Sequence, residues 1–420
     1  MERVVTYPDA LAEVLRHAAG WHRPAVDDAV PLLEAAGRVL AEGVRAERDQ
    51  PPFARSTRDG FALRSGDLTS GARLRVVGSV RAGEQWTGTD LGQGEAVETM
   101  TGAPVPAGAD VVLMVEHASV TEDGVLVPDV SRVLAPGENI VPRGAEAQAG
   151  AELIPTGRRI GPAEIAMAAN CGCARVNVFG RPRVAIVATG DELVELSDKP
   201  EAWQIRNSNS YALAALVAAE GGQPERLPIA RDTREDLHER IARGREADLL
   251  LLSGGVSMGK YDLVEQALIE AGAEFFFTGA LIQPGKPVVF GRLEKQRSAT
   301  KDEGPGSSWT YFFGLPGNPV STEVCFRLFV APMLRRLAGQ TERSPRYTEA
   351  RLVEDLKGGA KVTRFLPAEV SGDWQSVQVR VIPWQGSGDL AANGRANGFV
   401  VLPMGVERFR AGDTVRVLLR

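Results

Sequence analysis

The stretch that decides the fold is Leu249-Leu250-Leu251-Leu252-Ser253-Gly254-Gly255-Val256-Ser257-Met258-Gly259-Lys260-Tyr261-Asp262. Its four leucines predict a strand covered on both faces, as in a parallel sheet. The glycines that follow allow a tight turn whose backbone N–H groups come close to a ligand, and the serines add hydroxyl groups. Such a loop, ahead of a helix that begins near Asp262, favours phosphate or another anion. The alternative interpretation is a tight connection followed by a capped helix.

The length and composition indicate a protein of several globular domains. The chain has 420 residues, of which 44% are hydrophobic and 24% charged, and its net charge is −6. Because one hydrophobic core rarely serves more than roughly 250–300 residues, we expect about two to four domains. The net negative charge, without a lysine-rich block, argues against nucleic acid as a main partner.

The compartment is predicted from the termini, the apolar runs and the cysteines. The first twenty residues are rich in charge and lack the apolar core of a signal peptide. No apolar run is long enough to cross a membrane. The three cysteines, Cys171, Cys173 and Cys325, predict a reducing compartment, so we expect a cytoplasmic protein. The four scattered histidines argue against a zinc enzyme or a histidine-based triad.

The alternation of patterns along the chain predicts four domains. Short β-type runs separated by glycine and proline turns indicate two β regions, whereas alternating strands and helices indicate a doubly wound, mostly parallel sheet. Within these regions we expect amphipathic helices over residues 6–18 and 30–40 and one continuous helix over residues 320–337. The predicted domains are an N-terminal helical and linker domain of two segments (1–49 and 141–180), an inserted β domain (50–140), an α/β domain (181–337) and a terminal β-barrel (344–420).

Polar loops that follow the strands of the α/β domain are the candidate site. In an open parallel sheet such loops converge on one edge, at the carboxyl ends of the strands. Several carboxylates beside an anion-binding glycine loop require a cation, and Mg²⁺ would bridge carboxylate and phosphate oxygens. The alternative is that the acidic residues and Asn318 only cap helices. The residues concerned are Asp191, Glu192, Asp232, Ser253, Gly254, Gly255, Asp262, Lys286, Pro316, Gly317, Asn318 and Pro319.

Five motifs, in the order in which the family has them, make the chain resemble the molybdopterin molybdenumtransferases. These are the molybdenum insertases of molybdenum-cofactor biosynthesis and are related to the gephyrin C-terminal domain. The resemblance covers nearly the whole chain. The glycine loop from Ser253 to Gly259, with Asp262, is similar to the pterin-binding signature of the family. The other motifs are Met100-Thr101-Gly102-Ala103-Pro104, Thr189-Gly190-Asp191-Glu192-Leu193, Pro284-Gly285-Lys286-Pro287 and Leu315-Pro316-Gly317-Asn318-Pro319.

The resemblance implies an insertion reaction without ATP. Adenylylated molybdopterin and molybdate are the implied substrates, Mg²⁺ the cofactor, and molybdenum cofactor and AMP the products. It also implies a homodimer with a shared site, a pterin adenylyltransferase upstream, molybdoenzymes downstream, and neither a nucleic-acid nor a membrane partner. The implied catalytic residues are Asp59, Thr101, Glu192, Asp232, Asp262 and Lys286; the implied metal ligands are Glu192, Asp232 and Asp262; and the implied ligand-binding residues are Ser253, Gly254, Gly255, Ser257, Gly259, Pro316, Gly317, Asn318, Pro319 and Ser321.

Four positions depart from the family pattern. Arg58 stands where methionine is common, Gln283 where lysine is frequent, Val141 in an arginine-rich loop, and Pro367 where arginine ends a Phe-Leu-Arg triplet. These departures leave open a paralogue with altered activity or a preference for tungsten. Two further alternatives are a non-catalytic, gephyrin-like scaffold and a pterin adenylyltransferase or nucleotide hydrolase built on the α/β domain, although an adenylyltransferase usually needs only that domain.

Overall fold

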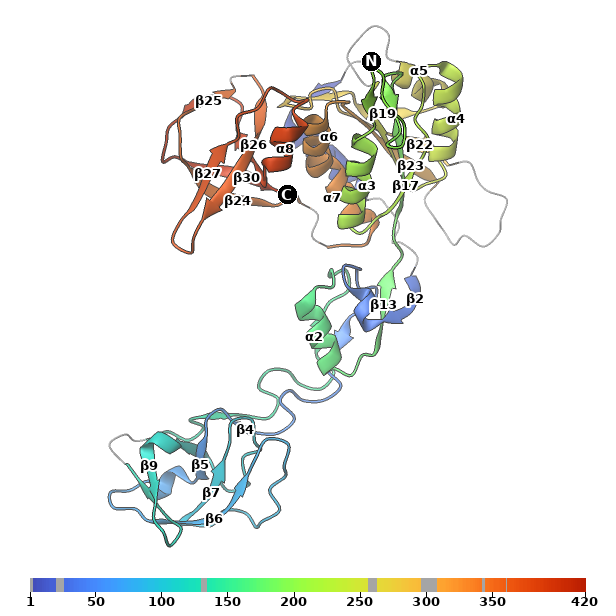
Figure 1. The fold of residues 1–420 in the computed structure, drawn as a ribbon. Helices are drawn as coiled ribbons and strands as arrows, with labels where there is room; N and C mark the ends of the chain where they lie inside the picture. The colour runs from blue at the N-terminus through green and yellow to red at the C-terminus, as the bar shows by residue number, and fades with distance from the viewer. Residues whose placement is uncertain are drawn as a thin grey trace. The chain divides into compact units, whose positions relative to one another are not determined.

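The computed structural model describes residues 3–19, 26–129, 134–255, 263–295, 308–341, 344–359 and 361–420. The chain divides into two compact units, which Figure 1 shows as ribbons. The large unit comprises Met1–Ala41, Gly157–Gly161 and Val176–Arg420, and the small unit comprises Glu42–Thr156 and Pro162–Arg175. The units are described separately below, and the predicted boundaries of the four domains stay a prediction.

A doubly wound sheet forms the centre of the large unit. Within the described residues, its strands are β17 (Gln223–Arg226), β14 (Arg183–Ala188), β18 (Leu249–Ser253), β23 (Trp309–Leu315), β22 (Val289–Glu294) and β19 (Glu274–Phe277), in this spatial order. The first four strands are parallel, whereas β22 and β19 are antiparallel to their neighbours. The predicted mostly parallel sheet is therefore confirmed, with two antiparallel strands at one end.

Helices cover both faces of this sheet. Leu249 and Leu251 of β18 pack with α3 (Asn209–Ala219) and the helical run that begins at Pro319. Leu250 and Leu252 point to the other face, against α4 (Arg234–Gly244) and α5 (Leu263–Glu270), which lie together in Figure 1. All four leucines are fully buried. Burial on both faces explains why this strand is a continuous apolar run rather than an alternating one.

The sequence predicts one continuous helix over residues 320–337, but the helical run after β23 is not one regular α-helix. It consists of α6 (Pro319–Cys325), a π-helical turn η4 (Phe326–Val330) and α7 (Ala331–Leu337). Pro332 lies at the start of α7 and has no N–H group to donate to the carbonyl four residues earlier. A wider turn before the proline accommodates this missing bond, so the helix continues through an irregular segment instead of ending.

A closed barrel forms the C-terminal part of the large unit. Within the described residues, β26 (Thr363–Gly372), β27 (Val377–Val381), β24 (Tyr347–Leu352), β30 (Thr414–Leu419) and β28 (Gly398–Leu402) pair in sequence, and β28 also pairs with β26. This closure removes free strand edges and confirms the predicted terminal barrel. The remaining elements here are β21 (Ile282–Gln283), β25 (Leu356–Gly359), β29 (Val406–Phe409) and α8 (Leu390–Arg395).

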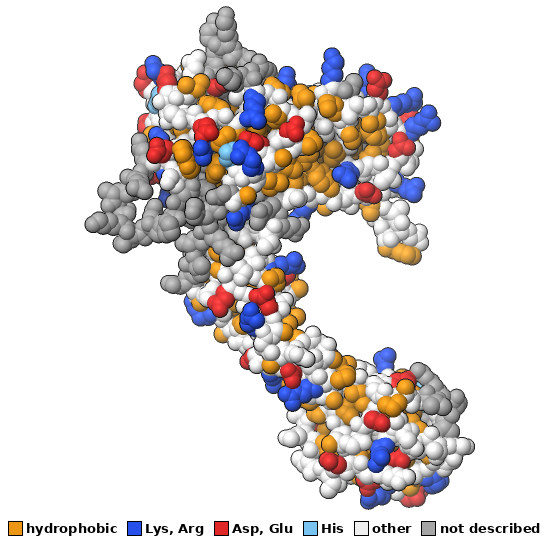
Figure 2. All heavy atoms as spheres, turned by 180° about the vertical axis from the view of Figure 1, so that it is seen from behind, with side chains coloured by type: hydrophobic (Ala, Val, Ile, Leu, Met, Phe, Trp, Pro, Cys, Tyr) orange, Lys and Arg blue, Asp and Glu red, His pale blue; other side chains and the backbone are white. Residues whose placement is uncertain are grey.

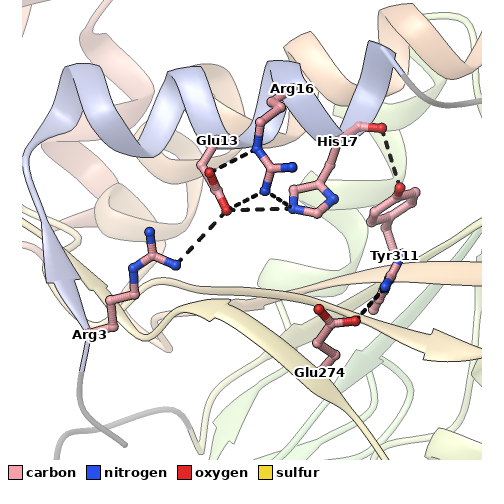
Figure 3. A network of polar contacts seen from close by, with 7 residues as sticks. Arg3, Glu13, Arg16, His17, Glu274 and Tyr311 are labelled. Carbon is pink, nitrogen blue, oxygen red and sulfur yellow. Dashed lines mark hydrogen bonds and ion pairs between the residues drawn. The ribbon is translucent and has the colours of Figure 1, made fainter.

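The first helix, α1 (Tyr7–Ala19), packs on the sheet through Ala10, Val14 and Ala18. Arg16 and His17 in its last turn belong to a polar network with Glu13 and Arg3, which Figure 3 shows together with Tyr311 and Glu274. The Arg16 guanidinium contacts Nε2 of His17 at 2.7 Å. The His17 ring stacks on Phe276 with 3.5 Å between centroids.

The predicted helix over residues 30–40 is wrong. The structure has strand β2 (Val26–Pro31) and a single 3₁₀ turn η1 (Leu32–Ala35) in this region. Gly37 has φ +77° and donates its N–H to the carbonyl of Ile160. This left-handed conformation stops helical winding, and the segment pairs with β13 (Arg175–Phe179) instead. The short pairs β1 (Val4–Val5) with β20 (Gly279–Ala280) and β15 (Leu193–Val194) with β16 (Ile205–Arg206) complete the large unit.

A β-sheet with its own core dominates the small unit. Within the described residues its strands are β8 (Val111–Met114), β5 (Gly60–Leu63), β7 (Glu95–Thr99), β6 (Leu74–Val80), β10 (Val125–Pro128) and β9 (Ala118–Val120). Phe61, Leu74 and Leu113 belong to the core beneath it. The unit also contains β3 (Val44–Arg45) with β12 (Glu152–Ile154), β4 (Arg55–Ser56) with β11 (Ile140–Val141), and α2 (Pro162–Asn170).

The surface shows no segregation of charge on the face that Figure 2 presents, where acidic and basic side chains are interspersed. Within the described ranges, no helix is both long and apolar enough to span a bilayer. Cys171, Cys173 and Cys325 are all free thiols.

Candidate functional site at the carboxyl edge of the parallel sheet

The register of the parallel strands brings three motif loops to one edge of the sheet. Ala188 at the end of β14 pairs with Ser253 at the end of β18, and Ser253 pairs with Leu315 at the end of β23. The next residues of each strand therefore leave the sheet side by side. Strand β22 runs in the opposite direction and begins at this same edge, where Val289 pairs with Gly314. Lys286 precedes Val289 by three residues and so belongs to the same edge.

The glycine loop after β18 has a backbone that only glycine adopts without strain. Gly254 has φ +99° and Gly255 has φ +62°. A Cβ atom at Gly254 would lie 2.5 Å from the Thr189 carbonyl oxygen, and one at Gly255 would lie 2.5 Å from Cγ2 of Val264. Gly254 donates its N–H to the carbonyl of Leu315 at 3.1 Å. The two glycines are required by geometry, whereas the predicted residues Ser257, Gly259 and Asp262 lie outside the described residues.

The loop after β23 is held by buried hydroxyl groups. Thr322 is 3% exposed, and its Oγ1 donates to the carbonyl of Pro316 at 2.6 Å. The same hydroxyl lies 3.0 Å from the Asn318 carbonyl. Asn318 itself is exposed, and its side-chain amide donates to Oγ of Ser387 at 2.8 Å. The predicted ligand residue Ser321 is buried next to Thr322, while Gly317 and Asn318 present their surface to solvent.

One side chain joins the two loops. Nδ2 of Asn209, the first residue of α3, lies 3.0 Å from Oγ of Ser253, 2.7 Å from the Gly317 carbonyl and 3.3 Å from Oγ1 of Thr322. The sequence places Asn209 in a run of capping residues, and nothing in that run distinguishes a cap from a tertiary contact. The structure shows that its amide group makes tertiary contacts.

Acidic residues follow β14 and β17 at the same edge. The backbone N–H of Asp232 donates to Oδ1 of Asp191 at 3.2 Å, and Gly190 donates to the carbonyl of Ala230. The carboxylate of Glu192 lies close to Gly190: a Cβ atom at Gly190 would be 2.3 Å from Oε2 of Glu192. Asp191, Glu192 and Asp232 are exposed. Among the described residues, no three His, Cys, Asp or Glu side chains form a group that could hold a metal ion.

Lys286 is exposed on a loop whose backbone carbonyl groups accept hydrogen bonds from neighbouring segments. Its carbonyl accepts the N–H of Ala280 at 3.0 Å. The preceding Gly285 has φ +109° and lies against Cys325, whose thiol donates to the Gly285 carbonyl at 3.5 Å. Cys325 is fully buried, and this burial raises the pKa of its thiol far above the usual range. The thiol is a packing group under the loop, and the charge at this position comes from Lys286.

Asp59 and Thr101 meet in the small unit. Oδ1 of Asp59 accepts both the backbone N–H of Thr101 at 2.7 Å and its hydroxyl at 2.8 Å. The N–H bond, and next the hydroxyl bond, hold the pKa of the Asp59 carboxyl below its usual range. Both residues are exposed. The next residue, Gly60, has no room for a side chain, because a Cβ atom there would lie 1.9 Å from the Leu113 carbonyl oxygen. Two residues far apart in the sequence thus form one anionic group on the surface.

Comparison with known proteins identifies the family. Three family profiles match in order: the MoeA N-terminal region (domain I and II) over residues 5–172, the probable molybdopterin binding domain over 185–336, and the MoeA C-terminal region (domain IV) over 349–419. The molybdopterin molybdenumtransferase of Nostoc sp. is 34% identical over 404 residues, covering 93% of this chain and 88% of the relative. The chain belongs to the molybdopterin molybdenumtransferase family. The predicted family and its class, a transferase, are confirmed.

Further relatives and solved structures of the molybdopterin molybdenumtransferase family agree along the whole chain. The Staphylococcus epidermidis molybdopterin molybdenumtransferase is 30% identical over 418 residues, covering 98% of this chain and 96% of the relative. The molybdopterin biosynthesis moeA protein from Pyrococcus horikoshii OT3 has a TM-score of 0.79 at 28% identity, with full coverage of both chains. A second Pyrococcus horikoshii structure has a TM-score of 0.71 at 31% identity and covers 99% of each chain.

Two departures from the molybdopterin molybdenumtransferase pattern are placed by the structure. The side chain of Arg58 is exposed and, with Met114, His117, Leu134, Glu138 and Asn139, lines a cavity of about 230 Å³ in the small unit. Gln283 is exposed in β21 and pairs with Arg364 of β26. An arginine therefore stands next to Asp59, and an uncharged amide stands three residues before Lys286.

Proposed function

We propose that this chain transfers molybdenum from molybdate to adenylylated molybdopterin, releasing AMP and molybdenum cofactor, with Mg²⁺ and without ATP. The observation that carries the proposal is the register of Ala188, Ser253 and Leu315, since it brings three motifs of the family to one sheet edge. Glycine backbone, hydroxyl groups, exposed carboxylates and a lysine all belong to this edge. That set of groups suits a substrate carrying phosphate, a second oxyanion and a divalent cation.

The glycine loop is the proposed phosphate-binding element. Gly254 and Gly255 both have positive φ and carry no side chain, so their backbone can come close to a ligand. The N–H of Gly254 is already bonded to Leu315, which fixes the loop against β23. Ser253 supplies a hydroxyl, and we assign Ser257, Gly259 and Asp262 to the same element from the family motif alone.

The carboxylates fit Mg²⁺ by their chemistry. Mg²⁺ prefers oxygen ligands and is usually bound by one or two carboxylates together with substrate phosphates and water. Glu192 and Asp232 provide two exposed carboxylates at the sheet edge, and Asp262 is the third residue we assign to the ion. When bound, Mg²⁺ would neutralise negative charge on the phosphate groups. The carboxylates would hold the ion, while the backbone of the glycine loop would hold the phosphate.

Lys286, Ser321 and the loop Pro316–Pro319 are the proposed path for molybdate. Lys286 is a surface cation on an anchored loop, so it attracts an oxyanion without a carboxylate bonded to it in the described structure. The exposed Gly317 and Asn318 border this path. With Gln283 in place of a frequent lysine, Lys286 carries the charge at this loop, which makes it the residue whose removal should weaken molybdate binding most.

A homodimer with a shared site is the second part of the proposal. Asp59 and Thr101 form an exposed hydrogen-bonded pair in the small unit, without a substrate-binding loop of the sheet edge in the same unit. We propose that the pair of one chain completes the site of the other. The reaction then takes place in the cytoplasm, between a pterin adenylyltransferase that supplies the substrate and molybdoenzymes that receive the product.

AMP release tests the reaction. Purified protein with adenylylated molybdopterin should release AMP when both molybdate and Mg²⁺ are present, and should leave added ATP unchanged. Asp59→Asn should slow release by about tenfold or more, equivalent to about 1.4 kcal/mol. Asp373→Asn is the matched control, because Asp373 is also an exposed carboxylate with a pKa lowered by backbone N–H bonds, from Gln375 and Ser376. An unchanged rate in Asp59→Asn would overturn the assigned role.

Mixing two inactive variants tests the shared site. If the Asp59 pair of one chain serves the sheet edge of the other, then mixing the Asp59→Asn protein with the Lys286→Ala protein should restore activity in the mixed dimers. Each mixed dimer would contain one intact site. No recovery, with mixed dimers demonstrated by native mass spectrometry, would place all of these residues in a site within one chain.

A further inference from the structure

We propose that Asn209 is a positioning residue that sets the spacing between the glycine loop and the loop Pro316–Pro319. This inference rests on the proposed function, because those two loops are the assigned binding elements for phosphate and molybdate. Asn209 does not itself touch the reacting atoms in this assignment. Its role is to keep two separately folded loops at the distance that one substrate complex requires.

The side chain of Asn209 is free for this role because Asn207 supplies the side-chain bond to the first turn of α3. Oδ1 of Asn207 accepts the N–H of Ser210 at 3.2 Å, which satisfies one of the unpaired donors in the first turn of α3. Asn207 is 2% exposed and its own N–H donates to the Val194 carbonyl at 2.9 Å. The start of α3 thus has a side-chain bond that does not involve Asn209. The amide of Asn209 points away from this task and toward the two loops.

The donor arithmetic at Asn209 is specific. A side-chain amide nitrogen has two hydrogens, and here three acceptors lie within reach. The Gly317 carbonyl at 2.7 Å and Ser253 Oγ at 3.0 Å are the shorter contacts, and Thr322 Oγ1 at 3.3 Å is the longest. Thr322 already donates its own hydrogen to Pro316. One hydrogen of Asn209 therefore serves each loop, so the amide works as a clamp between them.

Asn209→Asp tests the clamp because it keeps the shape and removes both donors. A carboxylate faces the Gly317 carbonyl without a hydrogen, so we expect affinity for adenylylated molybdopterin to fall about tenfold or more. Below its pKa the new acid regains one O–H donor, and the neighbouring carbonyl raises that pKa by favouring the protonated form. Affinity measured by calorimetry should therefore recover several-fold between about pH 7.5 and about pH 5, relative to the unsubstituted protein at each pH.

Asn397→Asp is the matched control. Nδ2 of Asn397 donates to the Val370 carbonyl at 2.8 Å in the barrel, so the substitution removes the same kind of bond away from the sheet edge. We expect this variant to bind the pterin substrate normally at every pH. Equal losses in both variants would show a general effect on stability and would overturn the positioning role.

Hydrogen exchange of the ligand-free protein separates this inference from the proposed function. In Asn209→Asp, peptides covering residues 249–255 and 314–318 should exchange faster than in Asn397→Asp at neutral pH, whatever reaction the protein catalyses. Unchanged exchange in these peptides would refute the clamp. If the unsubstituted protein releases no AMP with molybdate and Mg²⁺ while exchange changes as expected, the proposed reaction fails and the clamp stands.

Discussion

The same substitution at two equally buried threonines should have different consequences for stability at the sheet edge. Thr322 and Thr189 are each 3% exposed, and both stand beside the candidate site. Thr322 Oγ1 donates to the Pro316 carbonyl at 2.6 Å. Thr189 Oγ1 is buried and has no hydrogen-bond partner within the described part of the chain. Replacing each with valine removes a hydroxyl of the same size from a similar environment, so only the hydrogen bonding differs.

The expected magnitudes follow from these bonds. Thr322→Val leaves the buried Pro316 carbonyl without its donor, which costs about 1–3 kcal/mol. For a domain of roughly 150–250 residues this lowers the melting temperature by about 2–12 °C. Thr189→Val removes a buried hydroxyl that makes no bond, so stability should stay unchanged or rise slightly. Because the chain folds as more than one unit, the transition of the large unit is identified by hydrogen exchange of β18 and β23 peptides during the melt.

Thermal unfolding of the two variants, side by side with the parent protein, checks this prediction. Thr322→Val should also bind molybdate and the pterin substrate more weakly, since its hydroxyl holds the loop that includes Gly317 and Asn318. Equal destabilisation in both variants would mean that volume and shape matter here rather than the hydrogen bond. That result would refute the argument that buried hydroxyl groups hold the loop after β23.

Three further predictions concern ionisable groups. Thr101→Val keeps the backbone N–H bond to Asp59 but loses the hydroxyl bond, so the pKa of Asp59, followed by carbon NMR, should rise partway toward its usual value. Burial, and next Arg16, lower the pKa of His17 from its ordinary value of 6.5. Because the unfolded chain binds that proton more readily, stability should fall as the pH drops below about 6.5. In urea titrations, His17→Phe should lose this acid sensitivity. Glu323 accepts bonds from Arg327 and Asn393 in a buried cluster. Glu323→Gln should therefore lower the free energy of unfolding by about 3–5 kcal/mol in the urea titrations, whereas shortening the side chain of an exposed acidic residue should change it little.

The fold could be predicted where local patterns agree with the final packing. Four leucines in succession indicate burial on both faces, and β18 has that environment. Strands β6, β28 and β30 coincide with short β-type runs of the sequence, as expected for the two β regions. The convergence of the motif loops also follows from the sequence, because parallel strands end at one edge.

The errors of prediction arise at one proline and one glycine. Pro332 introduces a π-helical turn that the apolar pattern does not reveal. Gly37 ends a pattern that otherwise resembles a short helix. The carbonyl that binds the N–H of Gly37 belongs to Ile160, far away in the sequence, whereas the bond missing at Pro332 is local.

The side-chain connections of the site could be predicted only in part. Asp59 and Thr101 are brought together by the pairing of β5 with β7, which no local pattern encodes. Asn209 looks like a capping residue because Asn and Ser cap helices so often. Its contacts with Ser253 and Gly317 depend on the packing of α3 against two loops, so they emerge only from the folded structure.

The measurement that tests the central claim most directly is the ratio of molybdenum incorporated into the pterin product to AMP released in a single turnover. Metal analysis of the isolated product and chromatography of the nucleotide give the two quantities from one reaction. We predict a one-to-one ratio, with neither product formed when molybdate or Mg²⁺ is omitted. AMP released without molybdenum in the pterin would show a hydrolase, and molybdenum inserted only with consumption of ATP would show a different reaction.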